Sequence, residues 1–267
     1  MPADYVHGYS SYESVRLHDQ ASTLADLLHC DSLFQPGSYV LEAGCGVGAQ
    51  TVILASKNPD SRFLSVDISV RSLAQAKRLI AARSIANVEF AKADIFRLPY
   101  PAESFDHVFV CFVLEHLADP RKALLSLKRV LKDDGTITAI EGDHGSAYFH
   151  PDSPAARKAI QCLVDIQAEA GGDSLIGRRL YPLLIEAGFS NVCVSPRMVY
   201  ADASRPAMVQ GFTRNTFTAM VKGVRQAAIA KGLIDAKTWA AGIRGLERTA
   251  RGDGTFCYTF FKAVGRK

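Results

Sequence analysis

The sequence lacks the features that mark several other classes of protein. None of its apolar runs approaches the roughly 20 residues that a membrane-spanning helix needs, and residues 1–11 contain no apolar core of a secretory signal. The six cysteines show no Cys-x-x-Cys spacing, and several lie within apolar stretches. This pattern is typical of reduced, buried thiols rather than of a disulfide framework or a zinc site. We therefore expect a cytoplasmic protein.

The sequence also has no large excess of positive or negative charge. The 267 residues carry a net charge of +4 and contain no dense run of lysine or arginine, so the electrostatic footprint of a nucleic-acid-binding surface is weak. The composition is otherwise ordinary for a globular protein, with 48% hydrophobic and 22% charged residues. We expect neither a nucleic acid nor a membrane as partner.

Short apolar segments alternate with stretches of helical periodicity from Gly37 to Asp143. Seven segments rich in strand-forming residues are expected to be strands, at residues 39–43, 62–67, 88–91, 107–113, 136–141, 191–200 and 255–264. Helical spacing predicts helices at residues 49–57, 70–83, 120–132, 153–170 and 176–187. The third of these is expected to stop with Gly135 in a left-handed cap. The alternation indicates right-handed βαβ units and thus an α/β, Rossmann-like, doubly wound, mostly parallel sheet.

Two segments lie outside the core that residues 37–200 and 255–267 are expected to form. Residues 1–36 are expected to be a helical cover, because apolar residues recur at helical spacing over 11–29. Residues 201–254 separate the last two strands and contain helical stretches at about 206–231 and 236–251. Neighbouring strands need only a short connection. This helical insertion therefore suggests a lid or a dimer surface, and a homodimer is possible.

The most informative stretch runs from Val40 to Gly48, where an apolar run leads into Gly44, Gly46 and Gly48. It predicts a buried strand, a tight turn and the start of a helix, because glycines without a Cβ let the backbone turn sharply and approach a ligand closely. The helix that follows offers unpaired N–H groups to a polar ligand. The loop by itself fits a dinucleotide or another adenosyl cofactor, because Gly44-x-Gly46-x-x-Ala49 also satisfies the looser dinucleotide pattern.

Acidic side chains follow the next strands at positions suited to a nucleoside. Asp67 ends the second expected strand, 19 residues after Gly48, where it can accept hydrogen bonds from both ribose hydroxyls. Asp94 follows the third strand and can accept a hydrogen bond from an adenine amino group, while Ile95 packs on the ring. Open α/β sheets bind ligands beyond the carboxyl ends of their strands, so we expect these residues to lie together.

Taken together, the motifs resemble the class I S-adenosylmethionine-dependent methyltransferases of the small-molecule type. They are Glu-x-Gly-x-Gly-x-Gly from Glu42, the acid that ends strand two, Ala-Asp-Ile at 93–95, Phe-Asp-x-Val at 105–108 and Leu-Glu-His-Leu at 114–117. The nearest group includes the ubiquinone and menaquinone biosynthesis C-methyltransferases. The resemblance implies S-adenosylmethionine as cofactor, a small organic methyl acceptor, and an antiparallel last strand in a seven-stranded sheet.

The resemblance also assigns cofactor contacts. It implies that Glu42, Gly44 and Gly46 line the methionine end, and that Cys111 and His116 border the methyl-transfer face. The position of Glu42 also weighs against an NAD-dependent dehydrogenase, because a carboxylate repels a pyrophosphate but suits an ammonium and a sulfonium.

Two residues of the N-terminal cover are further candidates for the cofactor site. Arg16 can pair with the methionine carboxylate, since a guanidinium fork suits that group, and Tyr9 can fold over the cofactor. The expected cofactor contacts are then Tyr9, Arg16, Glu42, Gly44, Cys45, Gly46, Gly48, Asp67, Ile68, Asp94, Ile95, Cys111 and His116.

Catalytic candidates are few, because methyl transfer from a sulfonium chiefly requires alignment and exclusion of water. His144 is the main candidate for a general base, with Asp143 as its orienting carboxylate and His116 as a second histidine near the cofactor. Structural roles for Asp143 and His116 remain open, and no metal is expected. Two alternative functions also remain: a methyltransferase-like, cofactor-binding regulatory protein without turnover, and an NAD-dependent dehydrogenase.

Overall fold

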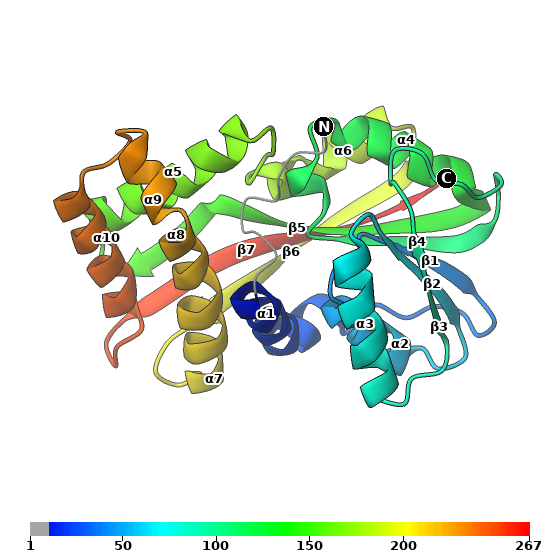
Figure 1. Ribbon diagram of the computed structural model, residues 1–267, viewed down its shortest axis with the longest axis horizontal. Coiled ribbons are helices and arrows are strands. Elements are labelled where there is room, and N and C mark those ends of the chain that lie inside the picture. The colour runs from blue at the N-terminus through cyan, green and yellow to red at the C-terminus, as the bar shows by residue number, and fades with distance from the viewer. Residues whose placement is uncertain (1–10) are drawn as a thin grey trace.

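One mixed sheet organises the protein (Figure 1). The computed structural model describes residues 11–267, and within this range seven strands form a sheet in the order β3-β2-β1-β4-β5-β7-β6. The strands are β1 (Tyr39–Ala43), β2 (Arg62–Asp67), β3 (Val88–Lys92), β4 (Phe105–Cys111), β5 (Leu131–His150), β6 (Ser190–Ala201) and β7 (Thr255–Arg266). The strands from β1 to β5 pair in parallel, and β7 runs antiparallel between β5 and β6. The expected Rossmann-like sheet with an antiparallel last strand is confirmed.

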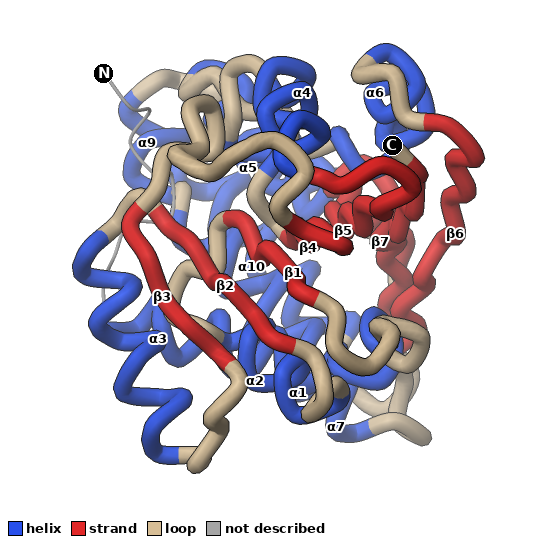
Figure 2. Tube along the Cα trace, turned by 90° about the vertical axis from the view of Figure 1, so that its right-hand side faces the viewer, coloured by secondary structure: helices blue, strands red, loops and turns tan. Residues whose placement is uncertain are grey.

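Helices cover both faces of this sheet (Figures 1 and 2). The α-helices are α1 (Ser11–His29), α2 (Ala49–Lys57), α3 (Val70–Ala82), α4 (Pro120–Val130), α5 (Pro154–Glu169), α6 (Leu180–Glu186), α7 (Pro206–Met208), α8 (Ala219–Gly223), α9 (Arg225–Ala230) and α10 (Ala236–Thr249). Two 3₁₀ turns, η1 (Leu114–His116) and η2 (Ile176–Arg179), and a π-helix, η3 (Val209–Thr218), complete the set for the described residues. Leu24 of α1 and Leu54 of α2 belong to one core cluster, and Leu124 of α4 and Leu183 of α6 belong to a second one.

The interior strands carry the apolar residues that such a position demands. Val40 and Leu41 of β1 and Val108 and Val110 of β4 are fully buried, since a parallel strand between two helical layers is covered on both faces. Because these strands point the same way, their carboxyl ends meet at one edge of the sheet. That edge carries the glycine loop.

The segment between β6 and β7 forms the expected helical insertion. Its helices α8, α9 and α10, together with α5, lie around the long ends of β5 and β7, whereas α7 contacts η3 and β6 (Figure 1). Phe212 and Phe217 of η3 pack against Tyr258 of β7, each with its ring centroid 5.4 Å from that of the tyrosine. The helical stretches that the sequence predicts around 206–231 are present, as a π-helix and short α-helices with a break at Val224.

The fifth strand is longer than the sequence predicts. Its expected span was 136–141, whereas β5 continues to His150 because its second half also pairs with β7. The pairing shifts register between Asp143 and Tyr148. Asp143 is therefore paired with Thr259 of β7, and His144 lies in the irregular stretch of β5 that follows it.

Two backbone reversals also differ from expectation. β4 ends at Cys111, because Phe112 adopts a φ of 57°, which an extended strand does not allow. After α4, Asp134 and not Gly135 takes the left-handed conformation, with a φ of 62°. Gly135 is required for space, because a Cβ there would lie 3.0 Å from the carbonyl oxygen of Asp106.

Candidate functional site

The loop between β1 and α2 turns through three glycines in the left-handed region. Gly44, Gly46 and Gly48 have φ values of 76°, 53° and 83°. A Cβ at Gly44 would lie 2.5 Å from Val113, and one at Gly48 would lie 2.9 Å from the Cβ of Ala76. A Cβ at Gly46 would meet no atom within 4 Å. Two of the glycines therefore allow close packing, and the third leaves backbone facing open space.

Asp67 connects the end of β2 to this loop. Its Oδ2 accepts a hydrogen bond from the Gly46 N–H at 2.9 Å, and its Oδ1 accepts one from the Ser69 N–H at 2.8 Å. Partial burial raises the pKa of this carboxyl. Ile68, the next residue, is half exposed beside it. The carboxylate thus lies at the rim of the glycine loop.

Glu42 lies beneath the loop and is buried. Its Oε2 accepts hydrogen bonds from the Thr51 hydroxyl at 2.7 Å and the Ser65 hydroxyl at 2.5 Å. Burial raises the pKa of Glu42 to about 7. A cation bound at the loop would favour the ionised form, because an opposite charge nearby lowers the pKa of a carboxyl group.

The other expected cofactor contacts lie close to the same edge of the sheet. Asp94 follows β3 and accepts a hydrogen bond from the Phe96 N–H at 2.9 Å, while Ile95 packs partly buried against the core. Cys45 and Cys111 are buried, and burial raises the pKa of both thiols. Neither cysteine is therefore a thiolate nucleophile near neutral pH.

A buried carboxylate supports the turn after β4. Glu141 of β5 accepts hydrogen bonds through Oε1 from the N–H groups of Val113 and Leu114, at 3.0 and 2.8 Å. Burial raises its pKa well above the ordinary value, and its Oε2 has no hydrogen-bond partner among the described residues. This support fixes η1, which carries Glu115 and His116 with a carboxylate-to-imidazole distance of 3.6 Å.

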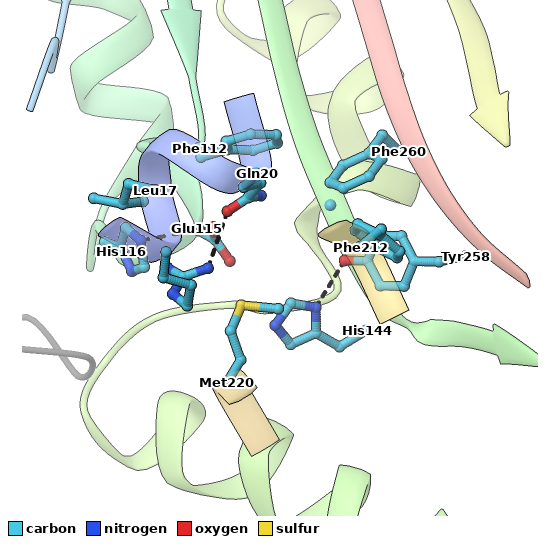
Figure 3. Close-up of a pocket in the computed structure, with 12 residues that line it drawn as sticks. Leu17, Gln20, Phe112, Glu115, His116, His144, Phe212, Met220, Tyr258 and Phe260 are labelled. Carbon is cyan, nitrogen blue, oxygen red and sulfur yellow. Dashed lines mark hydrogen bonds and ion pairs between the residues drawn. The ribbon is translucent and has the colours of Figure 1, made fainter. Parts of the chain in front are cut away.

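A cavity lies beside η1, between α1, the insertion and the ends of β5 and β7 (Figure 3). Its lining residues are Arg16, Leu17, Gln20, Phe112, Glu115, His116, Gly142, His144, Phe212, Met220, Tyr258 and Phe260. Arg16 is buried and donates to the Gln20 side chain at 3.0 Å. The cavity volume is about 50 Å³, below the ~150 Å³ of a cavity that holds benzene. The cavity as it stands is therefore too small for a ring-sized ligand.

His144 presents an imidazole to this cavity from β5. Its Nδ1 lies 2.8 Å from the Oη of Tyr258, and its ring meets Phe217 edge-on at 6.0 Å between centroids. Burial lowers the pKa of His144, so the ring is neutral at neutral pH. It is thus held against aromatic side chains and one hydroxyl.

Asp143 is adjacent in sequence but has a different partner. It forms two hydrogen bonds with the guanidinium of Arg178, at 2.8 and 2.7 Å, and accepts a third from the Gly145 N–H at 3.0 Å. The ring of His144 contacts Tyr258 instead. The structure therefore does not bring Asp143 and His144 together as a carboxylate–imidazole pair.

Sequence reasoning missed the residues that complete the cavity. Tyr258 lies 114 positions from His144 and belongs to no local motif. Met220 belongs to the insertion, which has no motif of its own. Phe112 did carry a signal, because it directly follows a strand whose carboxyl end was expected at the site.

Two aromatic residues of the insertion differ in their surroundings. Phe212 lines the cavity, whereas Trp239 is buried within the insertion and is not part of the lining. Tyr9 lies outside the described residues. Among residues 11–267, no group of three or more His, Cys, Asp or Glu side chains is arranged to hold a metal ion, and no helix has the length and apolar character to cross a membrane.

The sheet order, the left-handed glycines after β1 and the carboxylate at the end of β2 define a class I methyltransferase fold. Residues 41–139 match a family described as a methyltransferase domain. This match supports the resemblance to the class I S-adenosylmethionine-dependent methyltransferases, and S-adenosylmethionine is the cofactor of that family.

Three similar proteins illustrate the relationship. An uncharacterized 37.1 kDa protein in transposon TN4556 of Streptomyces fradiae is 32% identical over 204 residues, which cover 75% of this chain and 58% of that protein. A demethylmenaquinone methyltransferase of Bacillus mycoides is 31% identical over 108 residues, which cover 40% of this chain and 46% of that protein. The phosphoethanolamine N-methyltransferase 2 of Haemonchus contortus, solved with phosphomonomethylethanolamine and S-adenosylhomocysteine, has a TM-score of 0.56 at 16% identity over 92% of this chain and 52% of that one. The chain thus spans roughly half the length of these proteins.

Proposed function

We propose that this chain binds S-adenosylmethionine at the carboxyl edge of β1, β2 and β3 and transfers its methyl group to a small organic acceptor in the cavity. The observation that carries the proposal is the open space at Gly46, between two closely packed glycines. Backbone that faces open space at the start of a helix, beside a carboxylate, suits an adenosyl ligand. The match of residues 41–139 to a methyltransferase domain supports the same cofactor.

Each residue of the site then has a separate task. Asp67 accepts one backbone hydrogen bond at each carboxylate oxygen, from Gly46 and Ser69. The remaining lone pairs of the two oxygens accept hydrogen bonds from the ribose hydroxyls. Asp94 accepts from the adenine amino group, and Ile95 packs on the ring. Glu42 stabilises the positive charge of the methionine end from below, because its pKa near 7 lets a nearby cation ionise it.

The cavity holds the acceptor in line with the methyl group. When bound, the cofactor supplies an activated methyl carbon whose bond to sulfur breaks as the bond to the acceptor forms. The protein has to align the two groups and exclude water. Phe212 and Met220 come from the insertion, which favours a lid role for residues 201–254. The six free cysteines support a reducing, cytoplasmic location.

Ligand-induced stabilisation tests the proposal. S-adenosylhomocysteine at a hundredfold excess over its Kd should raise the Tm by roughly 5 °C or more, since it binds only the native state. NAD should leave the Tm unchanged. Asp67→Asn should weaken S-adenosylhomocysteine binding about tenfold or more, because it removes a charged acceptor.

Asp60→Asn is the matched control, because Asp60 is exposed in the turn before β2 at the opposite edge of the sheet. It should bind S-adenosylhomocysteine like the wild type. Stabilisation by NAD alone would overturn the proposal in favour of a dehydrogenase. Tight cofactor binding with no methyl transfer in a broad acceptor screen, together with capture of a protein partner, would indicate a regulatory protein instead.

A further inference from the structure

Part of the cavity wall comes from one helix with an unusual winding. Residues 206–223 form a continuous helix in which α7 and α8 flank η3, a π-helix of ten residues. Phe212 of η3 and Met220 of α8 both line the cavity (Figure 3). π-Helices are rare and are found frequently at functional sites, so the winding of η3 points to a role in the cavity.

The π winding decides which side chains of η3 face the sheet. Its hydrogen bonds join residues five apart, so residues i and i+5 lie on one face. Phe212 and Phe217 are such a pair, and each ring centroid lies 5.4 Å from that of Tyr258. The ring of Phe217 also meets that of His144 edge-on at 6.0 Å between centroids. In an α-helix, with about 100° between successive residues, Phe217 would be turned about 140° away from the face of Phe212.

Two buried hydroxyls show that the π winding leaves polar groups unpaired. The Oγ1 atoms of Thr213 and Thr218, again five residues apart, have no hydrogen-bond partner among the described residues. Both residues are buried, and unpaired buried polar groups are rare in native proteins. In an α-helix a threonine hydroxyl can donate to the carbonyl four residues earlier, so both groups would gain a partner. The α winding is therefore an accessible alternative for this segment.

We propose that η3 is the gate of the acceptor cavity and that it opens when its π-helix rewinds as an α-helix. The inference rests on the proposed function, because it assumes that the cavity receives the methyl acceptor. The first turn of η3 stays in place, since Gly211 packs closely against Thr23 of α1. Beyond this turn, each position on the helix surface is then taken by the residue one place earlier in the chain.

Rewinding changes the side chains at the cavity wall. An α-helix brings residues four apart onto one face, so Thr216 and not Phe217 would follow Phe212 on the face toward the sheet. Every later position shifts in the same way, and Ala219 takes the place of Met220 in the wall. Each exchange puts a small side chain where a large one stood. The cavity therefore widens enough for a ring-sized ligand to enter.

The insertion also has a place that absorbs the displaced residue. Val224 interrupts the helix between α8 and α9, with a φ of −92° and a ψ of 5°. The extra residue of the π-helix passes to this break when η3 rewinds. The movement is thus confined to residues 212–224, and α9 and α10 keep their positions.

A ring-sized thiol reagent tests the gate without cofactor or acceptor. Met220→Cys places a thiol in the wall, and mass spectrometry of its peptide separates its reaction with N-phenylmaleimide from that of the six native cysteines. Deletion of Arg214, an exposed residue of η3, leaves Phe212 and Phe217 four positions apart. An α-helix then keeps both rings on Tyr258, and the shift is lost. In the deletion variant we expect the introduced thiol to react at least about tenfold more slowly, because local opening is suppressed.

Arg214→Ala is the matched control for the deletion. It removes the same side chain, with its hydrogen bond to the Ala250 carbonyl, but keeps the length of η3. The introduced thiol should then react within about twofold of its rate without this change. Equal rates in the deletion variant and in this control would overturn the gate.

Hydrogen exchange in the wild type gives a second test, which decides the matter if the deletion variant does not fold. Rewinding breaks backbone hydrogen bonds in η3 and α8, whereas α10 of the same insertion keeps its own. Amides of residues 214–223 should therefore exchange at least about tenfold faster than the buried amides of α10. Equal protection would overturn the gate. If S-adenosylhomocysteine still raises the Tm in that case, the proposed function stands without it.

Discussion

At the scale of single residues, the three loop glycines look alike in the sequence but differ in their surroundings. All have positive φ, so alanine costs roughly 1–2 kcal/mol of stability at each of them. Gly48 also packs against Ala76, whereas Gly46 faces open space. We predict that Gly48→Ala destabilises the fold more than Gly46→Ala. Gly46→Ala should fold but weaken S-adenosylhomocysteine binding about tenfold or more, because its methyl group enters the space that the ligand approaches.

Thermal unfolding and ligand titration separate the two effects. Gly37→Ala is the matched control for Gly46→Ala, since Gly37 also has a positive φ (81°) and open surroundings but lies before β1. It should cost similar stability and leave the affinity for S-adenosylhomocysteine unchanged. If Gly46→Ala binds as tightly as Gly37→Ala, the open space above the loop is not the cofactor site.

At the scale of elements, α1 and η3 both contribute side chains to the cavity wall, and this part of the wall depends on close contact between the two helices. A Cβ at Gly211 of η3 would lie 2.1 Å from the Oγ1 and 3.0 Å from the Cβ of Thr23 on α1. Threonine is stiff at χ1, so the helices would have to separate. We predict that Gly211→Ala lowers the free energy of unfolding by about 1–3 kcal/mol, as measured by urea denaturation.

Gly223→Ala provides the comparison within the same insertion. Gly223 ends α8, and a Cβ there would meet no atom within 4 Å. Alanine at such a site stabilises a protein by about 0.4–1 kcal/mol, because it reduces the entropy of the unfolded chain. A Gly211→Ala variant as stable as Gly223→Ala would show that α1 and η3 are not in tight contact.

The sequence predicted elements well where their signals were local. The bounds of α1, β1 and β2 match the prediction, because apolar periodicity and glycine placement are properties of neighbouring residues. The extension of β5 to His150 escaped prediction, since it depends on pairing with β7 more than a hundred residues later.

The candidate site divides in the same way. The grouping of Asp67 and Asp94 at one edge was predictable, because side chains that follow parallel strands necessarily share an edge of the sheet, while their contacts with the cofactor stay a prediction. The partner of His144 was not, because a hydrogen bond to Tyr258 follows from the tertiary packing of β5 against β7. For the same reason nothing in the sequence indicated that Asp143 pairs with Arg178.

At the scale of the whole molecule, the buried carboxyl of Glu42 links ligand binding and stability to pH. The pKa of Glu42 is about 7 in the folded protein, whereas that of an unburied glutamate is 4.5. A bound cation favours the ionised form, so affinity for S-adenosylmethionine should rise with pH up to about 7. The slope can reach at most about tenfold per pH unit for one proton. Titration calorimetry at several pH values should show this rise in the wild type and a flatter profile in Glu42→Gln.

Stability without ligand should change in the opposite direction. Between about pH 4.5 and 7 the folded protein keeps the proton on Glu42, whereas the unfolded chain loses it. The unfolded state binds fewer protons there, so the free energy of unfolding falls as pH rises through this window. The difference between wild type and Glu42→Gln isolates this contribution from other carboxyls. A constant difference between the two proteins from pH 4.5 to 7.5 would contradict the assignment.

The position of β7 between β5 and β6 constrains the order in which the sheet forms during synthesis. β7 is synthesised after both of its neighbours, so β6 has no strand to pair with until residues 255–266 leave the ribosome. Tyr258 arrives with that strand. A nascent chain can therefore fold its parallel half, with the glycine loop, before it has a finished cavity. Non-local pairing of this kind is slow to form, so cofactor affinity should develop during synthesis earlier than the ability to hold an acceptor.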